Sequence, residues 1–465
     1  MDFVHHPCRA CWGESLYPSL SPDATRGYGP SNPPGFLSLY IHSFSHHFQS
    51  HPLYIERERA ALHFCLLWFL LTPMLAAHYL LIFILGGYTL NTLINLLFFR
   101  GLRTAAPPDN APLVSILIPA RNEARNIEAC VSSLLKQDYP RYEVIVLDDN
   151  SEDDTAEMVM NLYRACDNEQ VRKVLLRGDP LAEGWTGKGW ACHQLSKVAS
   201  GDYLLFIDAD TTHASGTLSA AVAFAQKHKT SLLSAWPRLI TKTLGEKLIV
   251  PIIPLIGFAF FPHWLLPILQ RFPSLARLVG TKFCRTFGAA NGQFMFFTRR
   301  AYDQIGGHAS VHDHVVEDVA LGRQIAQRTD EGLRLMNIES IHFSTVRMYQ
   351  SFGESWHGFT KNLRAAFDRE GFLFWLFIAC LVFCWLLPCF NWIWVRGVPL
   401  ETSFLAIGLI YLTRFLITLR FRLSWLNAFL HPVGILLIIG ICLHSWYLSI
   451  TGKVSWKGRT YKPNV

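Results

Sequence analysis

The feature that most constrains the fold of this chain is a set of long stretches that lack charged side chains. A helix needs ~20 apolar residues to cross a bilayer, and these stretches reach about that length or exceed it. They therefore predict membrane-spanning helices, with long buried core helices as the alternative. The stretches are residues 60–99, 373–395 and 425–450, which carry no Asp, Glu, Lys or Arg, and residues 402–419, which carry only Arg414.

These stretches also predict how the chain is organised. The acidic residues gather between them, so we expect a soluble region held between membrane segments. The first membrane segment could be one long helix or a hairpin broken at Pro73 or at Gly86-Gly87. The predicted order is a disordered extension (1–59) rich in His, Pro, Ser and Gly, an N-terminal membrane segment (60–100), the soluble region (103–371), a C-terminal membrane bundle (372–450) and a basic tail (451–465).

The charge balance limits the partners of the chain. Its formal net charge of +7 suits an anionic membrane surface or a phosphorylated substrate. The sequence contains no module typical of nucleic-acid binding. We therefore expect a membrane as a partner and no nucleic acid.

The soluble region alternates short apolar runs with helical patterns. Such alternation predicts βαβ units and a parallel sheet, and continuous apolar runs are typical of strands buried on both faces. The fold class predicted is α/β with a mostly parallel, Rossmann-like sheet flanked by transmembrane helices. The predicted strands are 113–120, 142–150, 171–178 and 201–210, and the predicted helices are 126–137, 154–165 and 189–199.

The segment LLFIDADTTH (204–213) places Asp208 and Asp210 at the end of a predicted strand. Ligands of such sheets bind beyond the carboxyl ends of the strands, and a period of two would put both carboxylates on one face. Adjacent carboxylates repel unless a cation lies near them, and Mg²⁺ and Mn²⁺ prefer carboxylates plus substrate phosphates. The segment therefore predicts a divalent cation with a diphosphate, and a solvated turn is the alternative.

Two further segments accompany this motif. The run VSILIPARNEARNIEACVSSLLKQDYPRYEVIVLDDNSEDDT resembles the opening of family 2 glycosyltransferases of the GT-A fold. FIDAD (206–210) is similar to the metal motif of that family, and VVEDVAL (315–321) to its acidic base motif. The resemblance covers residues 112–370. It implies an enzyme, an inverting and metal-dependent hexosyltransferase that takes its sugar from a nucleotide sugar, usually a UDP-sugar.

The resemblance implies roles for single residues. Asp149 matches the aspartate that meets the uracil, and Asp208 and Asp210 match the sugar- and metal-side acids that would hold Mg²⁺ or Mn²⁺. Asp318 matches the catalytic base, and Glu317 is a second catalytic acid or an ordinary acid at a helix start. The residues expected to bind the nucleotide sugar are Pro119, Arg121, Glu123, Asp149, Lys188 and Asp208.

The chemistry of glycosyl transfer agrees with these residue types. Lys188 lies in the Gly-rich segment GWTGKGWAC (184–192) and could neutralise a leaving diphosphate, although a surface lysine is the alternative. An acceptor hydroxyl is a poor nucleophile, so a general base must remove its proton. Asp318 is the candidate for that base.

The segment after the acidic motif predicts the acceptor. The Q-x-x-R-W motif of processive synthases is absent, and SWHGFTKNLRAAF (355–367) takes its place. This run, AANGQF (289–294) and WKGRTY (456–461) resemble the carotenoid-type branch of the family. The resemblance implies non-processive transfer to a membrane lipid, such as a carotenoid or similar isoprenoid. The acceptor-side residues predicted are Asn291, Gly292, Gln293, Trp356, Phe359, Lys361 and Asn362, with membrane anchoring as an equal alternative for Trp356.

Two other functions remain as alternatives. The first is a polyisoprenyl-phosphate or polysaccharide-type glycosyltransferase, against which the missing Q-x-x-R-W motif argues. The second is a non-catalytic membrane scaffold or sugar-nucleotide sensor. Clustered carboxylates are costly to bury, and a scaffold has no need for them.

One uncharged stretch inside the soluble region does not read as a regular span. Residues 248–270 contain prolines 251, 254, 262 and 267, which interrupt a helix. We predict an interfacial or re-entrant segment there, with a true transmembrane pair as the alternative, and an interface helix at 346–371. Because nucleotide sugars are cytoplasmic, we expect an integral protein of the plasma (cytoplasmic) membrane with its catalytic domain in the cytoplasm.

Overall fold

The computed structural model of the protein describes residues 52–367, 371–394, 399–452, 454–456 and 459–461. The chain divides into two units, residues 1–70 and 71–465. Helix α2 (Pro52–Phe98) begins in the first unit, so the prediction of disorder is wrong for residues 52–59. The rest of that predicted extension, residues 1–51, lies outside the described residues. The features below belong to the second unit.

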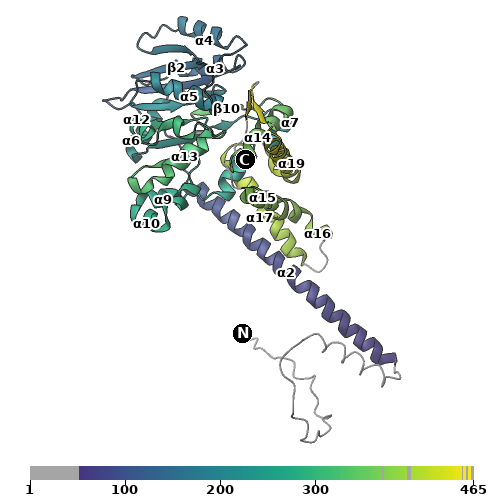
Figure 1. Ribbon diagram of the computed structural model, residues 1–465. Coiled ribbons are helices and arrows are strands. Elements are labelled where there is room, and N and C mark those ends of the chain that lie inside the picture. Colours follow the sequence, from purple (N-terminus) through teal and green to yellow (C-terminus); the bar gives the residue numbers. More distant parts are fainter. Residues whose placement is uncertain (1–51, 368–370, 395–398, 453, 457–458, 462–465) are drawn as a thin grey trace, which may run out of the picture. The chain divides into compact units, whose positions relative to one another are not determined.

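The centre of the second unit is a seven-stranded, mostly parallel sheet (Figure 1). β8 is the exception, because it runs antiparallel to both of its neighbours, while the other neighbouring pairs are parallel. This arrangement confirms the predicted α/β class. The strand order is β3 (Arg172–Arg177), β2 (Tyr142–Asp148), β1 (Val114–Ala120), β4 (Tyr203–Phe206), β8 (Met295–Thr298), β6 (Leu232–Trp236) and β9 (Leu335–Glu339).

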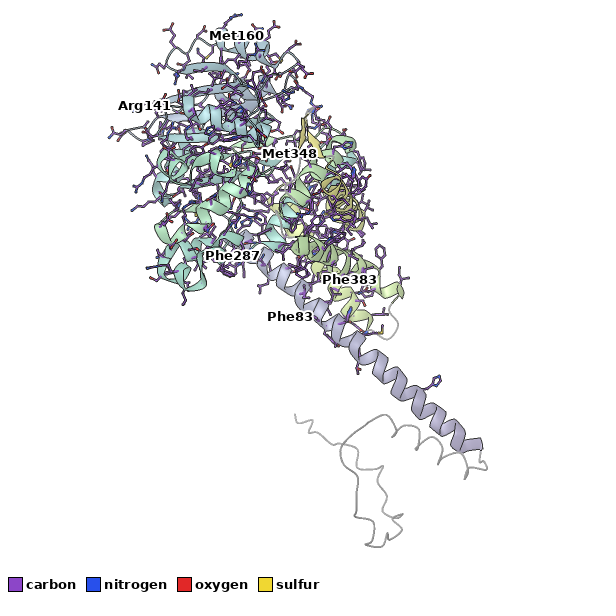
Figure 2. The ribbon with its side chains drawn as sticks, in the orientation of Figure 1. Phe83, Arg141, Met160, Phe287, Met348 and Phe383 are labelled. Atoms are coloured by element: carbon purple, nitrogen blue, oxygen red, sulfur yellow. The ribbon has the colours of Figure 1, made fainter. Side chains whose placement is uncertain are left out.

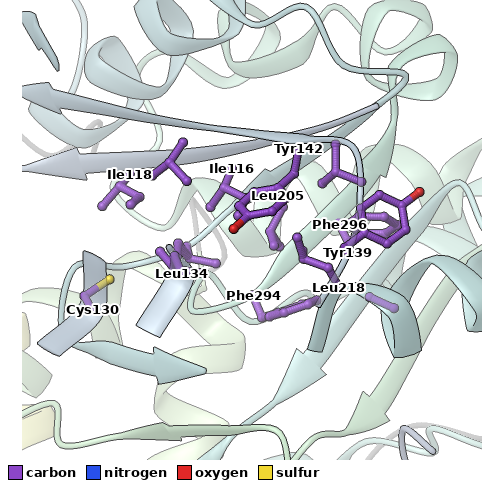
Figure 3. Close-up of a cluster of buried hydrophobic side chains, with 14 of the residues drawn as sticks. Ile116, Ile118, Cys130, Leu134, Tyr139, Tyr142, Leu205, Leu218, Phe294 and Phe296 are labelled. Atoms are coloured by element: carbon purple, nitrogen blue, oxygen red, sulfur yellow. The ribbon is translucent and has the colours of Figure 1, made fainter. Parts of the chain in front are cut away.

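Helices cover both faces of this sheet. On one face, Ile116 of β1 packs in a cluster with Leu134 and Leu218 (Figure 3). On the other face, the adjacent Leu117 packs in a cluster with Leu195. A strand buried on both faces leaves only its ends for polar groups, which places the functional residues at the sheet edge. The first face carries α3 (Ile127–Leu134), α4 (Thr155–Arg164) and α6 (Thr217–His228), and the second α5 (Gly187–Val198), α12 (Arg299–Gln304) and α13 (Glu317–Gln327).

Smaller elements complete the described chain. A three-stranded sheet has the order β5 (Thr211–His213), β10 (Ser344–Val346) and β7 (Arg238–Leu239), and its middle strand β10 precedes α14 (Phe352–Ala365) in the sequence. The tail forms a hairpin of β11 (Val454–Trp456) and β12 (Arg459–Tyr461). The short helices outside the membrane segments are α10 (Pro273–Val279), α11 (Thr281–Thr286), η2 (Gly307–Val311) and η3 (Thr329–Glu331).

The strand predicted over 201–210 is wrong at its end. β4 stops at Phe206, and Asp208 and Asp210 lie in the turn before β5. The turn closes because Thr211 donates from its backbone nitrogen and from Oγ1 to the carbonyl oxygen of Asp208, at 3.2 and 2.8 Å. The apolar run gave no sign of this side-chain bond. Strand periodicity is therefore not the reason why the two carboxylates meet.

In the part of the chain that the structure describes, the uncharged stretches form helices, and four of these are long and apolar enough to cross a membrane. α2 is continuous through Pro73 and Gly86, so the first stretch is one helix and not a hairpin. Phe83 and Phe383 project from this region (Figure 2) and are 78% and 63% exposed, as lipid-facing side chains would be. The candidate spans are Met74–Phe98 of α2, Gly371–Phe390 (α15 Gly371–Cys380, η4 Leu381–Leu386, η5 Leu387–Phe390), α17 (Leu400–Arg420) and α19 (His431–Ile450), with the short α16 (Asn391–Trp394) and α18 (Leu426–Phe429) between them.

Residues 244–271 form a bent helical segment and not a straight span. Its two parts, Leu244–Phe260 and Leu265–Arg271, meet at 50°. The side-chain amide of Asn95 on α2 donates to the carbonyls of Phe258 and Phe261, at 2.8 and 2.7 Å, and Asn91 donates to the carbonyl of Ala259 at 3.0 Å. These bonds satisfy backbone groups that the bend releases. The segment consists of α7 (Leu244–Ile249), α8 (Ile252–Leu255), η1 (Ile256–Phe260) and α9 (Leu265–Arg271).

Candidate active site

A cavity of about 250 Å³ opens where β1, β2 and β4 end. Most of the residues singled out in the sequence line it, although they come from distant parts of the chain. Trp356 and Phe359 are the exceptions. The predicted residues that line the cavity are Pro119, Arg121, Glu123, Asp149, Lys188, Asp208, Asp210, Asn291, Gly292, Gln293, Glu317, Asp318, Lys361 and Asn362.

One wall of the cavity consists of the loops after β1 and β2. The Arg121 guanidinium donates to the carbonyls of Asp149 and Asn150, at 2.6 and 2.9 Å. The backbone nitrogen of Asp149 donates to the carbonyl of Ala120 at 2.7 Å. Asn122 and Asn150 take left-handed backbone angles, with φ of 51° and 55°, which asparagine tolerates better than most residues. The two loops therefore hold each other, and Asp149 is fixed at their junction with 4% exposure.

Lys188 joins the two acidic segments at the centre of the cavity. Its Nζ lies 2.6 Å from Oδ1 of Asp208 and 2.9 Å from Oε1 of Glu317. Burial opposes the charge on Lys188, but the carboxylates of Asp208, Glu317 and Asp318 outweigh it and raise the lysine pKa well above its usual range. Burial likewise opposes the Glu317 carboxylate, yet the lysine lowers the pKa of Glu317. Lys188 is thus an ion-paired cation of this cavity and not a solvated surface lysine.

Asp210 provides a test of whether a divalent cation fits here. Its Oδ1 is buried and accepts no hydrogen bond from any described residue. Burial and the charges of Asp208 and Glu123 raise the pKa of Asp210 to about 7. A cation beside this unpartnered oxygen would favour the charged carboxylate and lower its pKa. Within the described ranges no group of three His, Cys, Asp or Glu side chains is arranged for a metal, so substrate phosphates would have to complete the coordination, as Mg²⁺ commonly requires. On that condition, the carboxylates of Asp208 and Asp210 fit a divalent cation.

Asp318 is held at the first turn of α13. The backbone nitrogens of Gly292 and Val319 donate to its two carboxyl oxygens, at 2.7 and 2.8 Å. Burial and the neighbouring Glu317 carboxylate nevertheless raise the pKa of Asp318 to about 6, against the opposing effect of Lys188. A Cβ on residue 292 would lie 2.9 Å from Oδ2 of Asp318, so glycine is what lets the backbone approach the carboxylate. An acid placed and tuned in this way can accept a proton near neutral pH.

The residues predicted on the acceptor side divide into two groups. Lys361 and Asn362 of α14 line the cavity, and burial lowers the pKa of Lys361 to about 8. Trp356 points elsewhere, because its Nε1 donates to Nδ1 of His444 on α19 at 2.9 Å. Phe359 is buried and packs against Tyr349, with ring centroids 5.6 Å apart. The structure therefore does not bring Trp356 or Phe359 into the cavity.

The loop at 291–293 is held by its own side chains and by a strand. The Asn291 backbone nitrogen donates to Oγ of Ser234 on β6, at 2.7 Å. The Gln293 backbone nitrogen donates to Oδ1 of Asn291 at 3.1 Å. These bonds fix the loop that carries Gly292 toward Asp318.

Some lining residues were not found from the sequence. Met348, which is labelled in Figure 2, and Tyr349 follow β10 and line the cavity from a segment without a recognisable motif. Burial and the charges of Asp210 and Asp208 raise the pKa of Tyr349. Thr186, Gly187, Ala191, Val315 and Val316 line the cavity too, and only their proximity to Lys188 and Glu317 could have indicated them.

The two histidines before the acidic motif make ordinary loop contacts. Nδ1 of His314 lies 2.9 Å from Oδ1 of Asp313. The ring of His312 packs against Trp185, with centroids 5.6 Å apart. Neither residue lines the cavity.

Comparisons with known proteins show a likeness to glycosyltransferases. Residues 115–280 match the family described as Glycosyl transferase family 2. The chain is 28% identical over 375 residues to the 4,4'-diaponeurosporenoate glycosyltransferase of Staphylococcus aureus strain N315, covering 77% of this chain and 91% of that protein. The protein of that name from strain USA300 is also 28% identical, over 367 residues, covering 76% of this chain and 89% of the other.

Similar solved structures include a mannosyltransferase and a synthase, and the likeness is distant. A mannosyltransferase from Pyrobaculum calidifontis in complex with GDP-Man and Mn²⁺ is 16% identical, covers 84% of this chain and 99% of its own, and has a TM-score of 0.46. A glucosyl-3-phosphoglycerate synthase from Mycobacterium tuberculosis in complex with Mn²⁺, UDP-glucose and phosphoglyceric acid is 18% identical, covers 57% and 87%, and has a TM-score of 0.32.

Proposed function

Because this chain is a glycosyltransferase with a family 2 domain at residues 115–280, we propose that it moves a single hexose from a UDP-sugar, such as UDP-glucose, to a membrane lipid. The observation that carries the proposal is the cavity itself. It brings Asp149, Lys188 and Asp318 together with the Asp208–Asp210 pair at one edge of the sheet. A nucleotide, a diphosphate and a reacting hydroxyl each find a suitable partner among these groups.

The donor half of the site would bind the leaving group. Asp149 would contact the nucleobase of the donor. Lys188, which is paired with Asp208, would neutralise phosphate oxygens. Asp208 and Asp210 are the residues that would hold Mg²⁺ or Mn²⁺, which when bound offsets the negative charge developing on the diphosphate. The chain's own contribution is a fixed positive charge close to the departing oxygen, which needs no reorganisation during the reaction.

The acceptor half would supply the base. Asp318 removes the proton of the acceptor hydroxyl as that oxygen attacks the anomeric carbon, and the bond to the diphosphate breaks on the opposite face, so the configuration inverts. The hydrogen bonds from Gly292 and Val319 orient the carboxylate for this attack. Glu317 keeps Lys188 in position and has the role of a positioning residue.

We further propose a carotenoid or a similar isoprenoid as the acceptor. The relatives named above are diaponeurosporenoate glycosyltransferases, and the described residues of this chain include four helices apolar enough to span a membrane. The bent segment 248–270 and α14, within 346–371, would then guide the lipid toward the base. Residues 103–371 would form the cytoplasmic catalytic domain at the plasma membrane, since nucleotide sugars are made in the cytoplasm.

The experiment for this proposal is a transfer assay on membranes that contain the full chain. Labelled UDP-glucose is added with Mg²⁺ or Mn²⁺, and the organic phase is extracted with and without a hydroxylated or carboxylated carotenoid. We expect label in a carotenoid glycoside, and we expect a chelator to abolish it because Asp208 and Asp210 need the cation. Restoration by Mn²⁺ after the chelator is the control. Label in another lipid would overturn the acceptor proposal, and chelator-resistant transfer would overturn the metal.

The pH dependence should report Asp318. The pKa of Asp318 is about 6. The fraction of deprotonated Asp318 therefore falls about tenfold for each pH unit below that value, and nearly all of the residue is deprotonated above about pH 7. Glu317, Lys188 and Lys361 are the charged groups that surround it. We expect kcat/KM for the donor, measured with saturating metal, to rise from about pH 5 and to level off by about pH 8. A profile that stays flat down to pH 5 (about a unit below the stated pKa) would contradict the assignment.

A further inference from the structure

A second cavity, of about 450 Å³, lies apart from the candidate active site. It is bounded by the end of α2, by α9 and by β9, and the two cavities have no lining residue in common. Phe287, which lines it, is labelled in Figure 2. No step proposed above uses this cavity.

The lining of this second cavity is positively charged. It includes Arg100, Arg271 and Arg334 but no Asp or Glu. The Arg100 guanidinium lies 3.3 Å from the ring of His228, and that of Arg334 donates to the carbonyl of His228 at 3.4 Å. Within the described part of the chain, none of the three arginines forms an ion pair with a carboxylate. The cavity thus carries positive charge that its own walls do not neutralise.

A buried amide at the cavity wall also lacks partners. Gln270 is 4% exposed and lines the cavity, yet neither its nitrogen nor its oxygen is hydrogen-bonded to any described residue. A buried amide without partners costs free energy, and natural proteins rarely leave one. A ligand that offers both an acceptor and a donor would satisfy it.

The cavity lies where a membrane span ends. The candidate span Met74–Phe98 stops at its rim, and α9 belongs to the bent apolar segment. Phe98 and Ile268, both of which line the cavity, are 68% and 42% exposed. Basic pockets at the ends of membrane helices are suited to lipid headgroups.

We propose that this cavity binds an anionic phospholipid whose headgroup carries a hydroxyl. The phosphodiester oxygens accept from the arginines and from the Gln270 amide nitrogen, and the headgroup hydroxyl donates to the Gln270 oxygen. The acyl chains lie along the exposed apolar side chains at the rim. The proposal needs neither the donor nor the acceptor assigned above, because the site does not share residues with the active site.

The test uses the full chain purified in detergent, without any nucleotide sugar. Its thermal midpoint is followed while short-chain phosphatidylglycerol, phosphatidylcholine of equal chain length, or glycerol phosphate is added. A ligand that binds only the folded protein raises the midpoint in a concentration-dependent way. We expect phosphatidylglycerol to raise it and the other two compounds to have little effect.

Two variants and a control locate the effect. Gln270→Leu and Arg334→Gln should each weaken the apparent affinity for phosphatidylglycerol by on the order of tenfold. Arg164→Gln, at an exposed arginine of α4, should not change it. Gln270→Leu removes an unsatisfied amide, so the lipid-free variant should be at least as stable as the parent, which distinguishes lost binding from misfolding.

Three results would overturn the proposal. The first is an equal shift of the thermal midpoint with phosphatidylcholine, which would mean that the site does not recognise the headgroup. The second is an equal shift with glycerol phosphate, which would make this a site for a soluble phosphate and not for a lipid. The third is unchanged lipid affinity in both variants.

Discussion

Replacing Asp318 by asparagine is expected to lower the transfer rate by on the order of 10²–10⁴-fold, the usual contribution of a general base. The amide keeps the shape of the side chain, and its single oxygen can accept from one of Gly292 and Val319, which donate to the two carboxylate oxygens at 2.7 and 2.8 Å. It cannot take a proton from the acceptor. Turnover with labelled UDP-glucose and carotenoid measures the loss.

Binding of the donor should survive the same change. Asp318 lies on the acceptor side in the proposed mechanism, so UDP affinity, measured by calorimetry with Mn²⁺ present, should stay within a few-fold of the parent. The matched control is Asp313→Asn, at an exposed aspartate in the loop before α13, which should turn over normally. Near-parental turnover of Asp318→Asn would exclude Asp318 as the base, and a parallel loss of UDP binding would make its role structural.

Lys188→Met should be the second most damaging change, and it should affect both catalysis and stability. The lysine is the partner of Asp208 and of Glu317, whose side chain is only 6% exposed. Without it the buried Glu317 carboxylate has lost its cation, which costs about 1–3 kcal/mol. The rate should fall on the order of 10²–10³-fold, because a fixed charge near the leaving oxygen is lost.

A double variant separates the two effects of Lys188. Lys188→Met combined with Glu317→Gln removes the uncompensated charge, so the thermal midpoint should recover while turnover stays low. Lys197→Met, at an exposed lysine in the last turn of the same helix, is the matched control and should change neither quantity. If the double variant were no more stable than the single one, the lysine–Glu317 pair would not be what stabilises this site.

The sequence predicted most of the site because chemistry and topology coincide there. Parallel strands bring their carboxyl ends to one edge, so Asp149 after β2 and Asp208 after β4 could be placed together without knowing any distance. Predicting Lys188 in the cavity depended on its Gly-rich loop. The neighbouring strand end at Phe206 was missed, since the Thr211 bonds that turn the chain leave no trace in an apolar pattern.

The failures on the acceptor side have a different cause. Trp356 and Lys361 lie on one helix, and sequence spacing alone does not tell which face of that helix meets α19 and which meets the cavity. The bond from Trp356 to His444, 88 residues away, decides it. Tyr349 was missed for the same reason, because its place depends on long-range packing and not on a local motif.

The amide side chains of Asn91 and Asn95 have a consequence for how this enzyme can be altered or can evolve. They bond the carbonyls of the bent segment at Ala259, Phe258 and Phe261, so the N-terminal helix is not an interchangeable tether. A foreign transmembrane helix of equal length and hydrophobicity would hold the protein in the bilayer but leave those carbonyls without hydrogen-bond donors. Exchange of this helix for an unrelated membrane anchor should therefore destabilise the protein. A variant truncated to remove the helix should lose both its membrane attachment and its fold.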